Sequence, residues 1–242
     1  MRQAYHAELQ AIGDALVEMA RLVGSAMGRA TSALLDADLQ LAQSVISADD
    51  TIDDLQRDLE NRAIAVLARQ QPVATDLRIV VTSLRMGADL ERGGDLASHV
   101  AKLARLRHPS PAIPRDLRRS VLEMGQLAQR LMAQAAEVLL THDVPSALQL
   151  EKDDDRMDEL HRVIFQHLMD DRWQHSVEAA VDVALVGRYY ERFADHAVSV
   201  ARSVVYLVTG DTGDHAPFSG PGPAPGRRGP LPARDRSSVC VR

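Results

Sequence analysis

The sequence contains few of the residues on which several structural classes depend. Cys240 is the single cysteine in 242 residues, so one chain can form neither a disulfide framework nor a cysteine-based metal site. Aromatic residues make up 3%, while apolar residues as a whole make up 45%. The core must therefore be mainly aliphatic, which favours packed helices over a β-sandwich. No segment has the roughly 20 uninterrupted apolar residues of a membrane-spanning helix.

Charge and motif content disfavour further classes of function. The formal net charge is −6, and a general nucleic-acid-binding protein needs a basic surface for phosphate contacts. The chain has no glycine-rich phosphate loop, no Gly-x-Ser-x-Gly nucleophile motif and no visible nucleophile–base arrangement. The N-terminus also lacks the apolar core of a signal peptide. We therefore expect a cytoplasmic binding protein rather than an enzyme.

Helical periodicity extends through most of the chain. Apolar residues recur at intervals of three and four in six segments, which is typical of amphipathic helices. Short polar turns separate most of these segments, so neighbouring helices should be antiparallel. The six expected helices cover residues 3–35, 39–70, about 75–106, about 115–141, 145–171 and 175–209.

The second half of the chain repeats the first. Glu18-Met19 recurs as Glu123-Met124 at an offset of 105 positions, and later matches keep this offset or one of 100. Three prolines lie in the eight residues 107–114, and six of the eleven prolines lie in the last 33 residues. The fold class predicted is all-α, with two tandem three-helix bundles. The expected parts are a first repeat (1–107), a Pro-rich linker (108–114), a second repeat (115–210) and a disordered tail (211–242).

Each repeat carries two pairs of carboxylates at helical spacing, in the motifs Asp-x-x-x-Asp and Glu-Arg-x-x-Asp. Residues four apart share one helix face, where like charges destabilise an isolated helix. Four carboxylates from two adjacent helices would form an all-oxygen site suited to Mg²⁺, Ca²⁺, Mn²⁺ or iron. The eight candidate metal ligands are Asp49, Asp53, Glu91, Asp95, Asp154, Asp158, Glu191 and Asp195.

Other interpretations of these pairs remain open. Acidic helix faces can serve solubility alone, in which case the chain is a metal-free helical scaffold. A carboxylate-bridged di-metal oxidative enzyme is a third possibility, but ferritin-like bundles need two Glu-x-x-His motifs. Asp158-Glu-Leu-His161 is the nearest approach to that pattern, and His99 and His196 are interpreted as core or surface residues. Gly93-Gly94, within an expected helix, indicates either close packing or a kink.

The doubled motifs resemble the PhoU family of phosphate-signalling proteins. The resemblance covers about residues 1–210. The residues that carry it are the two Glu-Arg-x-x-Asp runs, the two Asp-x-x-x-Asp pairs, Pro72 with Asp76-Leu77-Arg78, and Tyr206-Leu207-Val208-Thr209-Gly210.

Membership of this family would imply two three-helix bundles side by side. It would also imply a negative regulator of phosphate uptake and phosphate-starvation signalling, acting between the ATPase subunit of a phosphate ABC transporter and a sensor histidine kinase. Family proteins carry metal on such acidic faces, which transfers to the eight carboxylates above. The metal is left open among iron, manganese, magnesium and zinc. We also expect a homodimer and no binding to nucleic acid.

Overall fold

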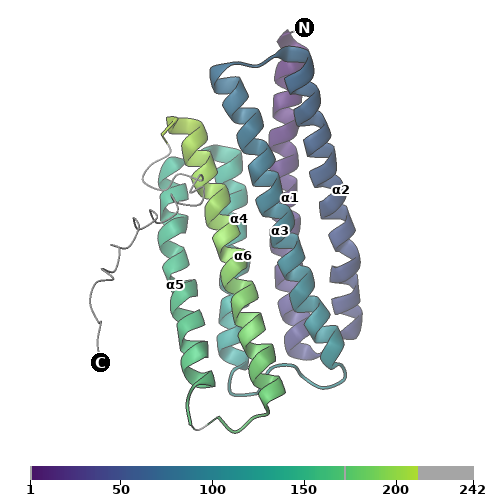
Figure 1. Ribbon diagram of the computed structural model, residues 1–242, viewed down its shortest axis with the longest axis vertical. Coiled ribbons are helices and arrows are strands. Elements are labelled where there is room, and N and C mark those ends of the chain that lie inside the picture. Colours follow the sequence, from purple (N-terminus) through teal and green to yellow (C-terminus); the bar gives the residue numbers. More distant parts are fainter. Residues whose placement is uncertain (1, 172, 212–242) are drawn as a thin grey trace, which may run out of the picture. The chain divides into compact units, whose positions relative to one another are not determined.

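Six α-helices make up the computed structural model, which describes residues 2–171 and 173–211 (Figure 1). The predicted all-α architecture is confirmed, and most helix ends lie within three residues of those expected. From residue 212 onward, the tail predicted to be disordered lies outside the described residues. The helices are α1 (Arg2–Asp36), α2 (Leu39–Gln70), α3 (Ala74–Arg107), α4 (Arg118–Thr141), α5 (Val144–Leu168) and α6 (Val177–Thr209).

Matched aspartates fix the start of the middle helix in each repeat. The carboxylate of Asp38 accepts a hydrogen bond from the backbone N–H of Leu41 at 2.9 Å, which caps α2. Asp143 does the same for α5, accepting from the N–H of Ser146 at 3.0 Å. An aspartate at this position satisfies one of the free N–H groups of the first turn. Both helices that carry Asp-x-x-x-Asp pairs therefore begin at equivalent positions.

The helices form two layers. α2, α3, α6 and α5 lie side by side in that order, and α1 and α4 lie behind them (Figure 1). The two repeats meet where α1 packs on α4 and where α3 packs on α6. The three-helix repeats therefore share faces and form one compact unit that ends at Gly210.

Small residues allow this close contact between the repeats. A Cβ atom at Gly125 of α4 would lie 2.4 Å from Thr31 Cγ2 of α1. A Cβ atom at Gly93 of α3 would lie 2.8 Å from Val23 Cγ1 and 3.7 Å from Phe193 Cε2 of α6. Since α3 continues as a helix through this point, the structure supports close packing as the role of Gly93.

Buried polar contacts also join the repeats. Tyr190 of α6 is fully buried, and its hydroxyl lies 2.9 Å from Oγ1 of Thr31 on α1. Because Thr31 donates its own proton to the carbonyl oxygen of Met27, Tyr190 is the donor in this pair. Burial raises the pKa of Tyr190 well above its ordinary value, so the hydroxyl stays protonated and able to donate.

Candidate functional site

The eight predicted carboxylates lie in two groups, one on the helix pair α2–α3 and one on the helix pair α5–α6. Helix α2 packs directly against α3, and α5 packs directly against α6. This packing brings together the two acidic motifs of each repeat. We call these groups the first cluster (Asp49, Asp53, Glu91, Asp95) and the second cluster (Asp154, Asp158, Glu191, Asp195).

Carboxylate groups in the first cluster interact electrostatically. Burial raises the pKa of Asp49 above its ordinary value, and the charges of Asp95 and Asp53 raise it further. Burial also raises the pKa of Glu91, and Asp95 is again the main neighbouring charge that adds to this shift. The first cluster therefore concentrates negative charge that protein cations only partly offset, among them Lys102 beside Asp49.

Gly94 makes room for the carboxylate of Asp49. A Cβ atom at Gly94 would lie 3.2 Å from Asp49 Oδ1 and 3.1 Å from Ile52 Cδ1 of the same helix. Ser98, one turn further along α3, lowers the pKa of Asp49 as a hydroxyl donor would. Its buried Oγ nevertheless has no partner that meets the geometry of a hydrogen bond. The unpartnered oxygen beside the first cluster is therefore the hydroxyl of Ser98, not one of the four carboxylates.

Asp154 is the most strongly perturbed carboxyl of the second cluster. Burial raises its pKa to about 7, and the charges of Asp195 and Asp158 are the next largest causes. Its Oδ1 atom is buried and has no hydrogen-bond partner among the described residues. Burial also raises the pKa of Glu191, where an ion pair with Arg188 acts in the opposite direction. An unpaired buried carboxylate oxygen is costly, and either a proton or a cation would stabilise it.

His161 is a site residue to which the sequence analysis gave little weight. It lies on α5 on the same face as Asp154 and Asp158, and its positive charge would lower the pKa of Glu191. Its Nε2 atom is buried, and the part of the chain that the structure describes offers it no hydrogen-bond partner. The carboxylate-x-x-His spacing was the signal that could have identified it.

The donor set of both clusters fits a cation chemically, although the donors do not converge on one point. Among residues 2–171 and 173–211, no three His, Cys, Asp or Glu side chains are arranged to hold a metal ion. Carboxylates without a cation repel one another, and a bound cation would draw them together. The buried, unpartnered Oδ1 of Asp154 is the observation that best indicates such a fit.

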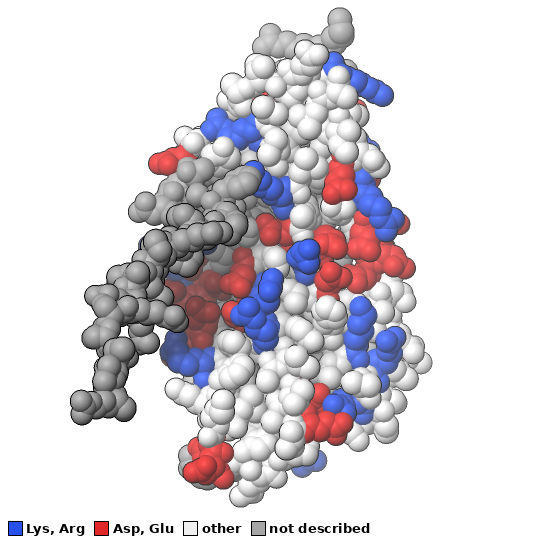
Figure 2. Space-filling view, in the orientation of Figure 1, with Lys and Arg blue, Asp and Glu red and all other residues white. Residues whose placement is uncertain are grey.

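The helices that carry the clusters form one face of the molecule, made of α2, α3, α6 and α5 (Figure 1). Figure 2 shows Asp and Glu side chains gathered at mid-height on this face, over both helix pairs, with Lys and Arg among them. Asp89 of α3 contacts α6. Its carboxylate is 3.0 Å from His196 Nδ1 and accepts a hydrogen bond from Ser199 Oγ at 2.7 Å. His196 is therefore part of the contact between the repeats.

Asp154 should give the metal-free protein a distinctive pH dependence. Because the pKa of Asp154 is raised in the folded state, its contribution to stability is lost as pH rises from about 4 through about 7, and the loss levels off above that pH. Asp154→Asn should therefore stabilise the chelator-treated protein at pH 8 by about 1–2 kcal/mol, a value reduced for partial solvent exposure. At pH 4 the variant and the wild type should be nearly equal.

Urea denaturation at both pH values, in the presence of a chelator, measures this difference. The exposed neighbour Asp155 provides the control, because Asp155→Asn should have a much smaller effect at pH 8. A destabilised Asp154→Asn variant at pH 8 would show that the carboxylate is held by favourable contacts instead.

The comparison with known families matches both halves of the chain. Residues 16–104 and 121–204 each match the model described as the PhoU domain. Each matched segment contains one complete carboxylate cluster. Among the described helices, none combines the length and the apolar character needed to cross a membrane.

Similar proteins span almost the same length. Phosphate-specific transport system accessory protein PhoU homolog 2 of Mycobacterium tuberculosis is 51% identical over 210 residues, covering 87% of this chain and 99% of that protein. PhoU homolog 1 of Mycobacterium leprae is 50% identical, with coverage of 87% and 95%.

Solved structures agree with these sequence comparisons. The crystal structure of PhoU from Pseudomonas aeruginosa has a TM-score of 0.78 and 32% identity, covering 86% of this chain and 100% of that one. The phosphate transport system regulatory protein PhoU from Streptococcus pneumoniae has a TM-score of 0.76 and 25% identity, with coverage of 86% and 98%.

Proposed function

The chain belongs to the PhoU family, and from that membership we propose that it restrains phosphate uptake and phosphate-starvation signalling when phosphate is plentiful. The family resemblance noted from the sequence is thereby confirmed. Membership of this family makes the chain an accessory protein of phosphate-specific transport. The observation that carries the proposal is the match of both repeats, each with its cluster, to the PhoU domain. Since its relatives are transport accessory proteins, this role is favoured over the oxidative di-metal enzyme.

We propose that the protein acts in the cytoplasm by docking on the ATPase subunit of the phosphate transporter and on a sensor histidine kinase. The face of α2, α3, α6 and α5 carries both signs of charge around the clusters and offers a broad surface for such contacts (Figure 2). A regulator of this kind needs only to bias a two-state equilibrium in its partner, which takes about 1–3 kcal/mol of coupling free energy. We expect the protein to act as a homodimer.

Each cluster is further proposed to bind metal. Asp49, Asp53, Glu91 and Asp95 would hold the cation of the first cluster, and the four carboxylates of the second cluster would hold the other. A bound cation supplies positive charge that offsets the repulsion among these carboxylates. Carboxylates from both helices of a pair would bind the same cation. The first cluster would thus link α2 to α3, the second would link α5 to α6, and both links would stiffen the docking face.

Deletion of the gene in phosphate-rich medium tests the regulatory role. Phosphate uptake and starvation-gene expression should both rise several-fold, and the wild-type gene should restore them. Any paralogue in the same genome has to be deleted as well. Normal uptake and expression in the complete deletion strain would contradict the proposed function.

Complementation tests the contribution of the second cluster. Glu191→Ala/Asp195→Ala should restore repression only in part if metal supports the docking face. Asp54→Ala/Asp58→Ala is the matched control, because these carboxylates are also four residues apart but are exposed outside both clusters. This control should restore repression fully.

A further inference from the structure

His161 gives the second cluster a donor type that the first cluster lacks. It follows Asp158 by one turn of α5 and Asp154 by two, so the three side chains share a helix face. The neutral imidazole nitrogen Nε2 is a common metal ligand. That atom is buried and has no hydrogen-bond partner within residues 2–171 and 173–211, which is unusual for a buried polar group.

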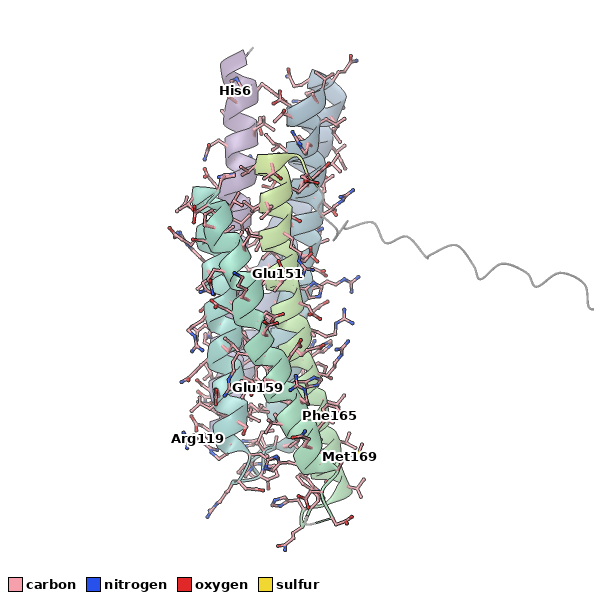
Figure 3. All side chains as sticks on the ribbon, turned by 90° about the vertical axis from the view of Figure 1, so that its left-hand side faces the viewer. His6, Arg119, Glu151, Glu159, Phe165 and Met169 are labelled. Atoms are coloured by element: carbon pink, nitrogen blue, oxygen red, sulfur yellow. The ribbon has the colours of Figure 1, made fainter. Side chains whose placement is uncertain are left out.

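The imidazole ring lies against α6 at Gly187. A Cβ atom at Gly187 would lie 3.3 Å from His161 Cδ2 and 3.8 Å from Nε2, so the absence of a side chain there leaves room for the ring. Gly187 precedes Glu191 by one helical turn. The ring of Phe165, labelled on α5 in Figure 3, packs edge-on against the imidazole with 4.8 Å between centroids. These contacts limit the positions available to Nε2.

The first cluster has a different arrangement at the equivalent positions. Gln56 is the counterpart of His161, and its amide donates to Glu60 on the same helix at 2.7 Å. Gly87 is the counterpart of Gly187, but the nearest atom to a Cβ there belongs to Leu59, at 3.3 Å. An apolar side chain thus occupies the place that the imidazole takes in the second repeat.

We propose that His161 coordinates metal through Nε2 and makes the second cluster selective for late first-row divalent ions such as Zn²⁺ and Co²⁺. This inference rests on the proposed metal-binding function of the clusters. Imidazole nitrogen suits these ions, whereas carboxylate-only sites suit Mg²⁺, Ca²⁺ and Mn²⁺. The two repeats would then differ in metal preference, although their carboxylates correspond one to one.

A substitution that copies the first repeat tests this proposal. In the full chain carrying Asp53→Ala/Asp95→Ala, which leaves the second cluster intact, His161→Gln should weaken Zn²⁺ binding at least about tenfold. Mg²⁺ binding should change by less than about twofold, because Mg²⁺ prefers oxygen ligands. Calorimetric titration of the metal-free protein measures both. His167→Gln, on the exposed part of the same helix, is the control and should leave Zn²⁺ binding unchanged.

Histidine-selective ¹⁵N NMR of the unmodified chain gives a second test that does not depend on how the variant folds. Zn²⁺ should shift the His161 Nε2 signal and leave that of His167 in place. Unchanged Zn²⁺ affinity in a folded His161→Gln variant, or an unmoved His161 signal in Zn²⁺-loaded protein, would overturn the inference while leaving the carboxylate sites standing. Failure of Zn²⁺ and Mg²⁺ to bind either cluster of the wild-type chain would instead contradict metal binding as a whole.

Discussion

The double variant Asp53→Ala/Asp95→Ala is expected to lose the metal of the first cluster and to keep that of the second. Each substitution removes one carboxylate from a different helix, so neither α2 nor α3 retains its acidic pair. Elemental analysis of protein purified without a chelator should show that metal per chain falls by about half. Asp54→Ala/Asp58→Ala changes the same number of charges outside the clusters and should keep the wild-type content.

Stability measurements separate a metal role from a purely structural one. In the presence of a chelator, Asp53→Ala/Asp95→Ala should be at least as stable as the wild type, because two like charges are removed from beside Asp49 and Glu91. With metal added, the wild type alone should gain stability from the first cluster. Unchanged metal content in the variant would show that the first cluster is not a metal site.

Arg107→Leu is expected to lower the urea midpoint of unfolding clearly, because it leaves the buried carboxylate of Asp182 without its partner. Arg107, at the end of α3, holds Asp182 near the start of α6 with Nε–Oδ2 at 2.6 Å and Nη2–Oδ1 at 2.9 Å. The side chain of Asp182 is only 5% exposed. Arg107 also forms an ion pair with Glu178, so one guanidinium group connects α3 to α6 through two carboxylates.

Removing both partners provides the control for Arg107. Arg107→Leu/Asp182→Leu should recover most of the lost stability, because no charge is then buried unpaired. Urea denaturation of the single and double variants measures both values. An unchanged urea midpoint for Arg107→Leu would show that Asp182 finds water or another donor.

Local features of the sequence were sufficient to predict the helices. The periodicity of apolar residues and the capping residues Asp38 and Asp143 act over a few positions, so both are visible in the chain itself. The sharing of faces between repeats was not predictable in this way. It depends on matched sizes across helices, such as Gly125 against Thr31 and Gly93 against Phe193, which periodicity does not reveal.

The same distinction applies to the candidate site. The carboxylates stood out because their spacing places them on one face and the duplication presents them twice. His161 gave only a weak signal, because its relation to Glu191 depends on Gly187 of another helix. Arg107 and Asp182 are 75 positions apart and belong to different repeats, so no local pattern joins them.

Anomalous diffraction from crystals of the full chain grown with Mn²⁺ would test most directly whether the two clusters are metal sites. We predict one set of anomalous peaks between α2 and α3, beside Asp49, Asp53, Glu91 and Asp95. A second and weaker set should lie between α5 and α6, beside the second cluster, because its histidine favours Zn²⁺ and Co²⁺ over Mn²⁺. Crystals that contain Mn²⁺ elsewhere but show no anomalous density at either cluster would contradict the proposal.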